Sequence, residues 1–182
     1  MGNKDRYSEW LYNSFGLTHI EILLINDAQG LGILDVELIE EFPKIKIDSE
    51  LEEDLSRKYR HMLISKLWVI GAYELIRLIN KMMPKEMDIY KEHTKEKLKE
   101  VLSLFTEVRV PLTKFQERGQ QRLYSGVAQF KVDSIKGVGW EILFSNKKGI
   151  ETKRFYRKDL GDSLLELLKQ LRRDIEIASS SP

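Results

Sequence analysis

Few side chains in this sequence could hold a metal or move a proton, and they are scattered. His19, His61 and His93 are far apart, and no two histidines have the spacing of a metal-binding pair. His93 and Glu96 would share one face of a helix, but a di-iron helical bundle needs several such pairs, and the sequence holds no matching set. The lack of cysteine excludes thiolate zinc sites, disulfides and cysteine nucleophiles. We therefore predict no metal, no cofactor and no catalytic residues, and we favour a binding protein over an enzyme.

Phosphate binding is the second chemistry to consider, because the chain contains the short glycine-rich sequence Gly30-Leu31-Gly32. A phosphate-binding loop places such a turn between a strand and a helix, with a lysine or an acidic residue at a set distance. That context is missing here. The two glycines instead predict a break between two helices.

Arg57, Arg60 and His61 lie together in a segment with helical periodicity. In residue type and helical setting they resemble the motif of the HEPN ribonucleases, in which a histidine follows an arginine after four to six residues and acts on the RNA backbone. Here three residues separate Arg57 from His61, and Arg60 is adjacent to His61, so the spacing departs from that motif. The resemblance implies a helical ribonuclease as one alternative function.

Charge is strongly segregated along the chain. Residues 1–56 contain 4 Lys/Arg and 13 Asp/Glu, a net charge of −9, whereas residues 108–158 contain 12 Lys/Arg and 4 Asp/Glu, a net charge of +8. The overall net charge of +1 hides this difference. Oppositely charged segments can pair within one chain or between two copies, so a homo-oligomer is an expectation.

The basic segment is the candidate for an anion-binding surface. Lys131 alternates with Phe130 and should point away from the core, a hairpin loop should expose its two lysines, and the remaining cations bracket a strand. The residues that we assign to this surface are Lys131, Lys147, Lys148, Lys153, Arg154 and Arg157. Basic and aromatic side chains together can bind nucleic acid, but Phe130, Trp140 and Phe144 fall on the alternation of a core face.

These observations lead to one main functional prediction and one further alternative. The main prediction is a non-catalytic binding or assembly module with charge-segregated surfaces, whose partner is a protein or a second copy of the chain. A nucleic-acid-associated protein that uses the basic strand region is the alternative.

The helical part of the chain is predicted with most support in its middle. A capping box at Ser49 and Glu52 opens a long helix over residues 50–83, which Pro84 ends. Apolar residues surround it except for a narrow polar stripe, in which Glu74 and Arg77 are expected to form a buried ion pair. A second helix over residues 88–105, ended by Pro111, should complete an antiparallel helical hairpin.

The remaining elements follow from other periodicities. Apolar residues at 20–25 predict a helix, with a buried strand as the alternative, and those at 34–42 predict another helix that Pro43 ends. Residues 44–48 alternate like a short edge strand. Period-two patterns at 128–132, 140–144 and 151–157 predict an antiparallel β-meander, and Asp159 should cap a final amphipathic helix.

The expected fold class is therefore α+β: a long helical hairpin core packed with a small antiparallel β-meander and a C-terminal helix. With 182 residues and 42% hydrophobic residues, the chain fits a single domain at residues 1–176, followed by a disordered tail at 177–182. Lys66, Glu74 and Arg77 interrupt the richest apolar stretch, which argues against a membrane span. We expect a soluble, cytoplasmic protein.

Overall fold

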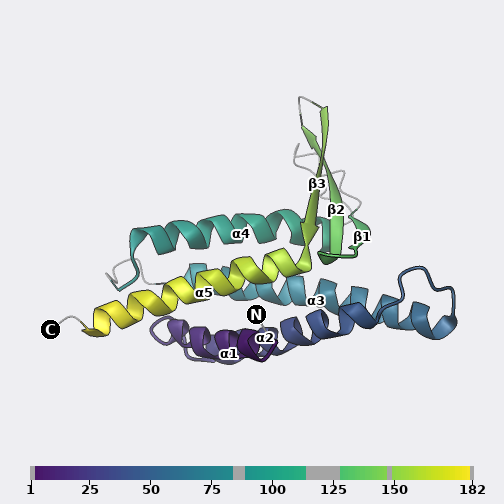
Figure 1. Cartoon of the computed structure of the whole chain (residues 1–182). Helices are drawn as coiled ribbons and strands as arrows, with labels where there is room; N and C mark the ends of the chain where they lie inside the picture. Colours follow the sequence, from purple (N-terminus) through teal and green to yellow (C-terminus); the bar gives the residue numbers. More distant parts are fainter. Residues whose placement is uncertain (1–2, 84–88, 114–127, 147–148, 181–182) are drawn as a thin grey trace.

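The computed structural model describes residues 3–83, 89–113, 128–146 and 149–180, and these form an α+β fold (Figure 1). Helices account for most of the described chain, and three strands form one antiparallel sheet. The elements in chain order are α1 (Asn3–Ser14), the 3-10 helix η1 (Phe15–Leu17), α2 (Leu23–Glu41), the 3-10 helix η2 (Phe42–Lys44), α3 (Glu52–Met82), α4 (Glu92–Thr113), β1 (Gln129–Asp133), β2 (Gly137–Asn146), β3 (Gly149–Tyr156) and α5 (Arg157–Ser180). The predicted fold class is confirmed.

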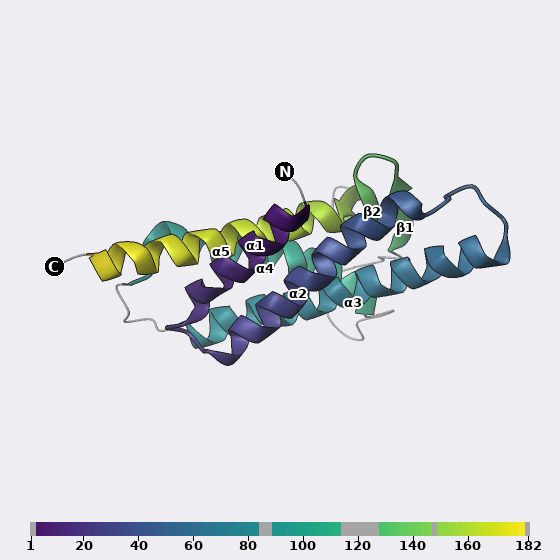
Figure 2. The same ribbon diagram turned by 60° about the horizontal axis from the view of Figure 1, so that its bottom comes forward.

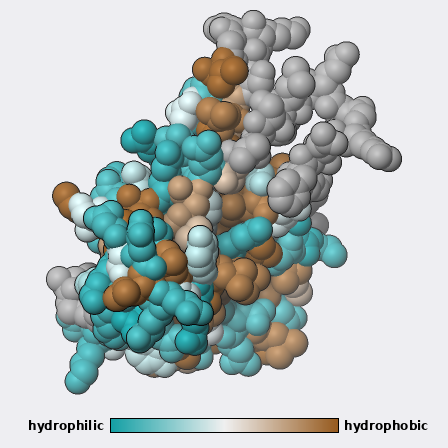
Figure 3. Space-filling view, turned by 90° about the vertical axis from the view of Figure 1, so that its right-hand side faces the viewer, coloured by the Kyte–Doolittle hydropathy of each residue, from teal (hydrophilic) through white to brown (hydrophobic). Residues whose placement is uncertain are grey.

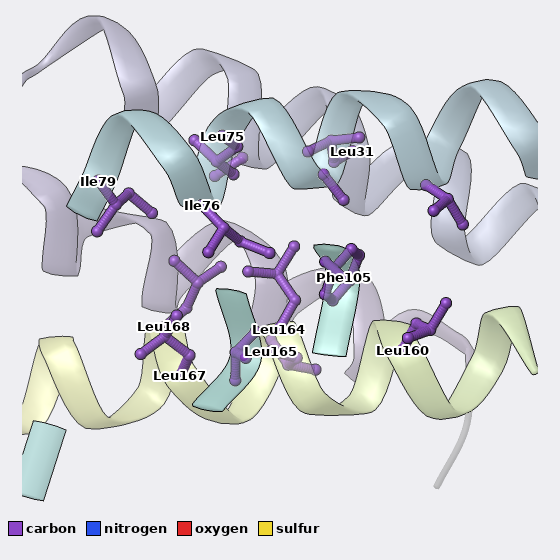
Figure 4. Packing of buried hydrophobic residues seen from close by; sticks show 14 of the residues in the cluster. Leu31, Leu75, Ile76, Ile79, Phe105, Leu160, Leu164, Leu165, Leu167 and Leu168 are labelled. Carbon is purple, nitrogen blue, oxygen red and sulfur yellow. The ribbon is translucent and has the colours of Figure 1, made fainter. Parts of the chain in front are cut away.

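The five helices form a closed ring around one core. Each helix packs against the next along the chain, and α5 returns to pack against α1 as well as α4 (Figures 1 and 2). Leucines of α5 recur every three or four residues and face Ile76 and Ile79 of α3, with Phe105 of α4 beside them (Figure 4). Each fully buried leucine contributes roughly 2 kcal/mol, so α5 is a main source of stability.

The predicted helical hairpin is present as α3 and α4, but α3 is buried on one face only. Trp68, Ala72, Ile76 and Ile79 are buried against its neighbours. In contrast Leu67 is 56% exposed, and Tyr59 and Leu63 are similarly exposed. The prediction of a helix buried on most sides was wrong for this stripe. The predicted ion pair between Arg77 Nε and Glu74 Oε2 forms at 2.6 Å, but both side chains are about half-exposed.

The predicted helix break at Gly30 and Gly32 was also wrong, because α2 runs continuously through both residues. Gly32 instead allows α1 to approach α2. A Cβ atom at Gly32 would lie 2.5 Å from Cβ of Trp10, which is fully buried, whereas one at Gly30 would meet nothing within 4 Å. Packing between the two helices requires glycine at position 32, and this requirement cannot be predicted from the neighbouring residues in the sequence.

Three further boundaries differ from the predictions. Residues 44–48 form no strand, since η2 and a turn occupy this segment and no neighbouring strand lies beside it among the described residues. Pro111 lies inside the last turn of α4 and does not end the helix, which continues to Thr113. Arg157 begins α5 directly after β3, so Asp159 lies in the first turn of the helix and does not cap it. At its other end α5 includes residues 177–180, which were predicted to belong to a disordered tail.

The sheet is the predicted meander, in the order β1-β2-β3. Phe130 pairs with Trp140, which pairs with Phe155, so the aromatic residues share the inner face. Between β1 and β2, the Asp133 carboxylate accepts hydrogen bonds from the backbone N–H groups of Ile135 and Lys136, both at 2.8 Å. Gly137 completes this turn with a φ of +83°, a conformation that favours glycine. The sheet lies where α4 ends and α5 begins, and its β2–β3 end projects away from the helices (Figure 1).

None of the described helices combines the length and the apolar character needed to cross a bilayer.

Candidate binding groove

A groove with a volume of about 1180 Å³ lies between the end of α2 and the first half of α3. The two helices run side by side in opposite directions, and the loop that joins them extends beyond the ring (Figures 1 and 2). The lining residues of each helix are three or four positions apart, so they share the face of that helix that borders the groove. The lining residues are Glu37, Leu38, Glu40, Glu41, Lys44 and Ile45 from the α2 side, and Glu52, Glu53, Ser56, Arg57, Arg60, His61 and Ile64 from α3.

The groove has an apolar floor. Leu38 belongs to the buried core, and Ile45 and Ile64 are half-buried, so the last two side chains offer most of the apolar contact area of the floor. Seen from the end of the molecule that carries the α2–α3 loop, hydrophobic residues lie among hydrophilic ones (Figure 3).

The walls of the groove carry more negative than positive charge. Five glutamates and three cations line it, a net charge of −2 if all are ionised. Glu41 accepts a hydrogen bond from Lys44 at 2.7 Å, which lowers the pKa of Glu41, and Arg57 lies 3.5 Å from Glu53. Within the described ranges, Glu37, Glu40, Glu52 and Arg60 have no ion-pair partner within 4 Å. These four charges are available to a ligand.

His61 lies at the base of the groove and is neutral at pH 7. It is only 5% exposed, and its ring centroid is 6.0 Å from that of Phe42. Burial lowers the pKa of His61 to about 4, and the positive charge of Arg157 acts in the same direction. The imidazole therefore packs as an uncharged ring. Arg57 and Arg60 line the same groove.

Arg157, which was assigned to the anion-binding surface, lies in the interior instead. Its guanidinium donates a hydrogen bond to the carboxylate of Asp35 on α2, which is fully buried. Asp35 also accepts hydrogen bonds from Arg6 Nε at 2.6 Å and Trp10 Nε1 at 3.0 Å. Burial lowers the pKa of Arg157 against the opposing effect of Asp35. This cluster joins α1, α2 and α5, and it explains why Arg157 is unavailable to an external anion.

The other predicted cations do not form one open basic surface. Lys131 Nζ lies 3.5 Å from Glu141, and Arg154 Nε donates to the same carboxylate at 2.7 Å, which lowers the pKa of Glu141. Lys153 belongs to the opposite face of the sheet, where its Nζ lies 3.1 Å from Glu107. Lys147 and Lys148 lie outside the described residues. Each described cation of the set is thus paired with a carboxylate of the same chain.

The sequence analysis missed the acidic wall of the groove. Glu37, Glu40 and Lys44 recur at helical spacing, so their common face could have been inferred. Nothing in the local pattern, however, indicated that this face lies opposite Arg60 and Ile64 of α3. No group of three or more histidine, aspartate or glutamate side chains suited to a metal ion occurs in the described part of the chain.

Comparison with known proteins adds no relative. The chain matches no known protein family, no curated protein and no solved structure. Its function must therefore be argued from its own residues.

Proposed function

We propose that this protein is a non-catalytic binding or assembly module and that the α2–α3 groove is its binding site for a protein segment. The observation that carries the proposal is a groove of about 1180 Å³ that combines an apolar floor with charges on both walls that have no ion-pair partner among the described residues. This volume slightly exceeds the usual range for small-molecule pockets, up to about 1,000 Å³, and suits a peptide. The neutral, buried His61 adds apolar contact area to the floor.

The charges favour a protein over nucleic acid. A nucleic-acid site must neutralise phosphates with lysine or arginine, but the groove has a net charge of −2. Outside the groove, Lys131, Lys153 and Arg154 are already paired with Glu141 or Glu107. A polyanion would have to compete with these carboxylates for the three cations.

The ribonuclease alternative has one observation in its favour, since Arg57, Arg60 and His61 line the same groove. Its test is cleavage of single-stranded RNA by the wild type and by His61→Ala. Cleavage that the substitution abolishes would replace the binding proposal by the enzymatic one. We expect no cleavage above background and no retention on heparin at low salt.

The binding proposal can be tested by site-directed labelling because the chain contains no cysteine. Ser56→Cys places a unique thiol in the groove, and Ser103→Cys places one on an exposed part of α4. Peptides selected by the wild type from a displayed random library should lose binding when a bulky maleimide occupies position 56. They should bind normally when it occupies position 103. A library that yields no peptides with this dependence would contradict the proposal.

A further inference from the structure

The groove has the shape of a site for a third helix. Two antiparallel helices packed side by side leave a channel between their exposed ridges, and another helix can seat its own ridge there. From Glu53 to Ile64 the α3 wall spans three turns, which is about 17 Å at 1.5 Å per residue. A segment of about 12 to 14 residues would cover this length as a helix.

An extended strand is a poor occupant for the same groove. Strand addition needs a sheet edge with free backbone N–H and C=O groups, but both walls are helices whose backbone groups bond internally. A helix satisfies its own backbone and needs the groove for side-chain contacts only. The floor residues Leu38, Ile45 and Ile64 can meet a single apolar stripe, so the helix must be amphipathic.

The wall charges are arranged so that they distinguish the two flanks of such a helix. Glu37 and Glu40 lie on the α2 wall without an ion-pair partner among the described residues. The α3 wall carries Glu52 and Arg60, both unpaired in the described ranges, so its unpaired charges cancel, whereas those of the α2 wall add to −2. Opposite charges that meet across an interface give specificity and fix the orientation of the partners. A helix bound in the groove therefore needs different side chains on the flank that faces α2 and on the flank that faces α3.

Resting on the proposed function, we infer that the groove binds an amphipathic helix of a partner protein, with lysine or arginine side chains facing α2 and a carboxylate facing Arg60. A second copy of this chain is a less suitable source of the helix. The main apolar stripes of α1, α2, α4 and α5 are buried in its own ring, and the exposed stripe of Tyr59, Leu63 and Leu67 belongs to α3, which already forms one wall of the groove. The described cations of the basic sheet are paired. The partner is therefore a different protein that carries this charge pattern.

Two synthetic helical peptides of about 14 residues test the inference. They have the same composition and the same apolar stripe. In the matched peptide lysines flank the stripe on the side that faces α2 and glutamates flank it on the α3 side, and in the swapped peptide these flanks are exchanged. Fluorescence anisotropy of each dye-labelled peptide, titrated with the unlabelled full chain, reports binding, and circular dichroism reports whether the peptide is helical when bound.

We expect the matched peptide to bind about tenfold more tightly, because two or three rim charge pairs each contribute up to about 1 kcal/mol. The double variant Glu37→Lys/Glu40→Lys should reverse the preference. The control Glu96→Lys/Glu100→Lys makes the same change of charge on exposed residues of α4, outside the groove, and should leave it unchanged.

Equal affinity for both peptides, or binding that Glu37→Lys/Glu40→Lys leaves unaltered, would overturn the inference. If the displayed library yields groove-dependent peptides that bind without helical structure, the inference fails and the binding function stands. If it yields none, both fail. Sedimentation of the unlabelled chain with each peptide would reveal a dimer if a second copy competes for the groove. A dimer that the peptide displaces would assign the groove to self-association and contradict a partner of different sequence.

Discussion

Arg157, the first residue of α5, donates a hydrogen bond to Asp35 of α2, and the two buried side chains lie 122 residues apart in the sequence. A Cβ atom at Gly161 would lie 2.7 Å from Asp35 Oδ1, so a glycine in the first turn of α5 allows the carboxylate to approach the helix. Arg6 bonds both Asp35 and Asp162, each at 2.6 Å, and so links α1 to the same cluster. The end of the sheet is thereby fixed to the first two long helices.

Asp35→Ala should reduce the free energy of unfolding by about 3 to 5 kcal/mol, because it leaves the positive charge of Arg157 buried and unpaired. Urea denaturation measures the loss. Asp162→Ala removes the other partner of Arg6, but Asp162 is half-exposed and its loss should cost less than about 1 kcal/mol. Equal effects of the two substitutions would mean that the Asp35 cluster is unimportant for stability.

Gly30→Ala and Gly32→Ala should have opposite effects, although both residues lie in the interior of α2. Alanine at position 30 meets no atom within 4 Å and should stabilise the helix by roughly 0.5 to 1 kcal/mol. Alanine at position 32 would clash with Trp10 and should destabilise the protein by about 1 to 3 kcal/mol. Thermal unfolding of the pair measures both changes. If both alanines stabilise, α1 does not pack on α2 at this point.

Ile76→Ala and Leu67→Ala compare the two faces of α3. Ile76 is fully buried, so its truncation should cost about 2 to 5 kcal/mol through lost transfer energy and a cavity. Leu67 is 56% exposed, and its truncation should cost less than about 1 kcal/mol. Chemical denaturation of both variants is the measurement, and a large loss for Leu67→Ala would show that this stripe is covered in solution.

The buried His61 should make the protein less stable in mild acid. The pKa of this histidine is about 4 in the folded protein and about 6.5 in the unfolded chain, so the unfolded chain binds more protons between these values. Stability should therefore fall as pH decreases from about 6.5 towards 4, with a contribution of roughly 2 kcal/mol from this residue. His61→Gln should show a weaker loss than the wild type between pH 7 and 4.5, measured by denaturation at each pH. A His61 resonance that titrates near 6.5 by NMR would contradict the assignment.

Self-association should depend on salt if the charged segments pair between copies, since screening weakens contacts between exposed charges. The exposed stripe of Tyr59, Leu63 and Leu67 offers apolar area for such a contact. Analytical ultracentrifugation at low and high salt measures the distribution of species. A monomer at every salt and protein concentration would remove self-association from the proposed functions.

The sequence alone determined the elements with strong local periodicity. The long helix α3, the amphipathic helix α5 and the three-stranded meander are each specified by the spacing of their own apolar residues, because a helix and a strand impose different periods on the residues that face a core. The Glu74–Arg77 pair was predictable for the same reason, since a helix brings residues three apart together.

Only the tertiary structure decided which faces are covered and where each charge lies. Leu67 and Ile76 have similar chemistry, and α3 buries only the second because α2, α4 and α5 occupy that side. Arg157 resembles Arg154 in the sequence, but it enters the interior because Asp35 reaches it from a helix far away in the chain. The groove likewise depends on how the end of α2 is placed against α3. Burial and ion pairing across such separations depend on packing between elements, which no local spacing of residues encodes.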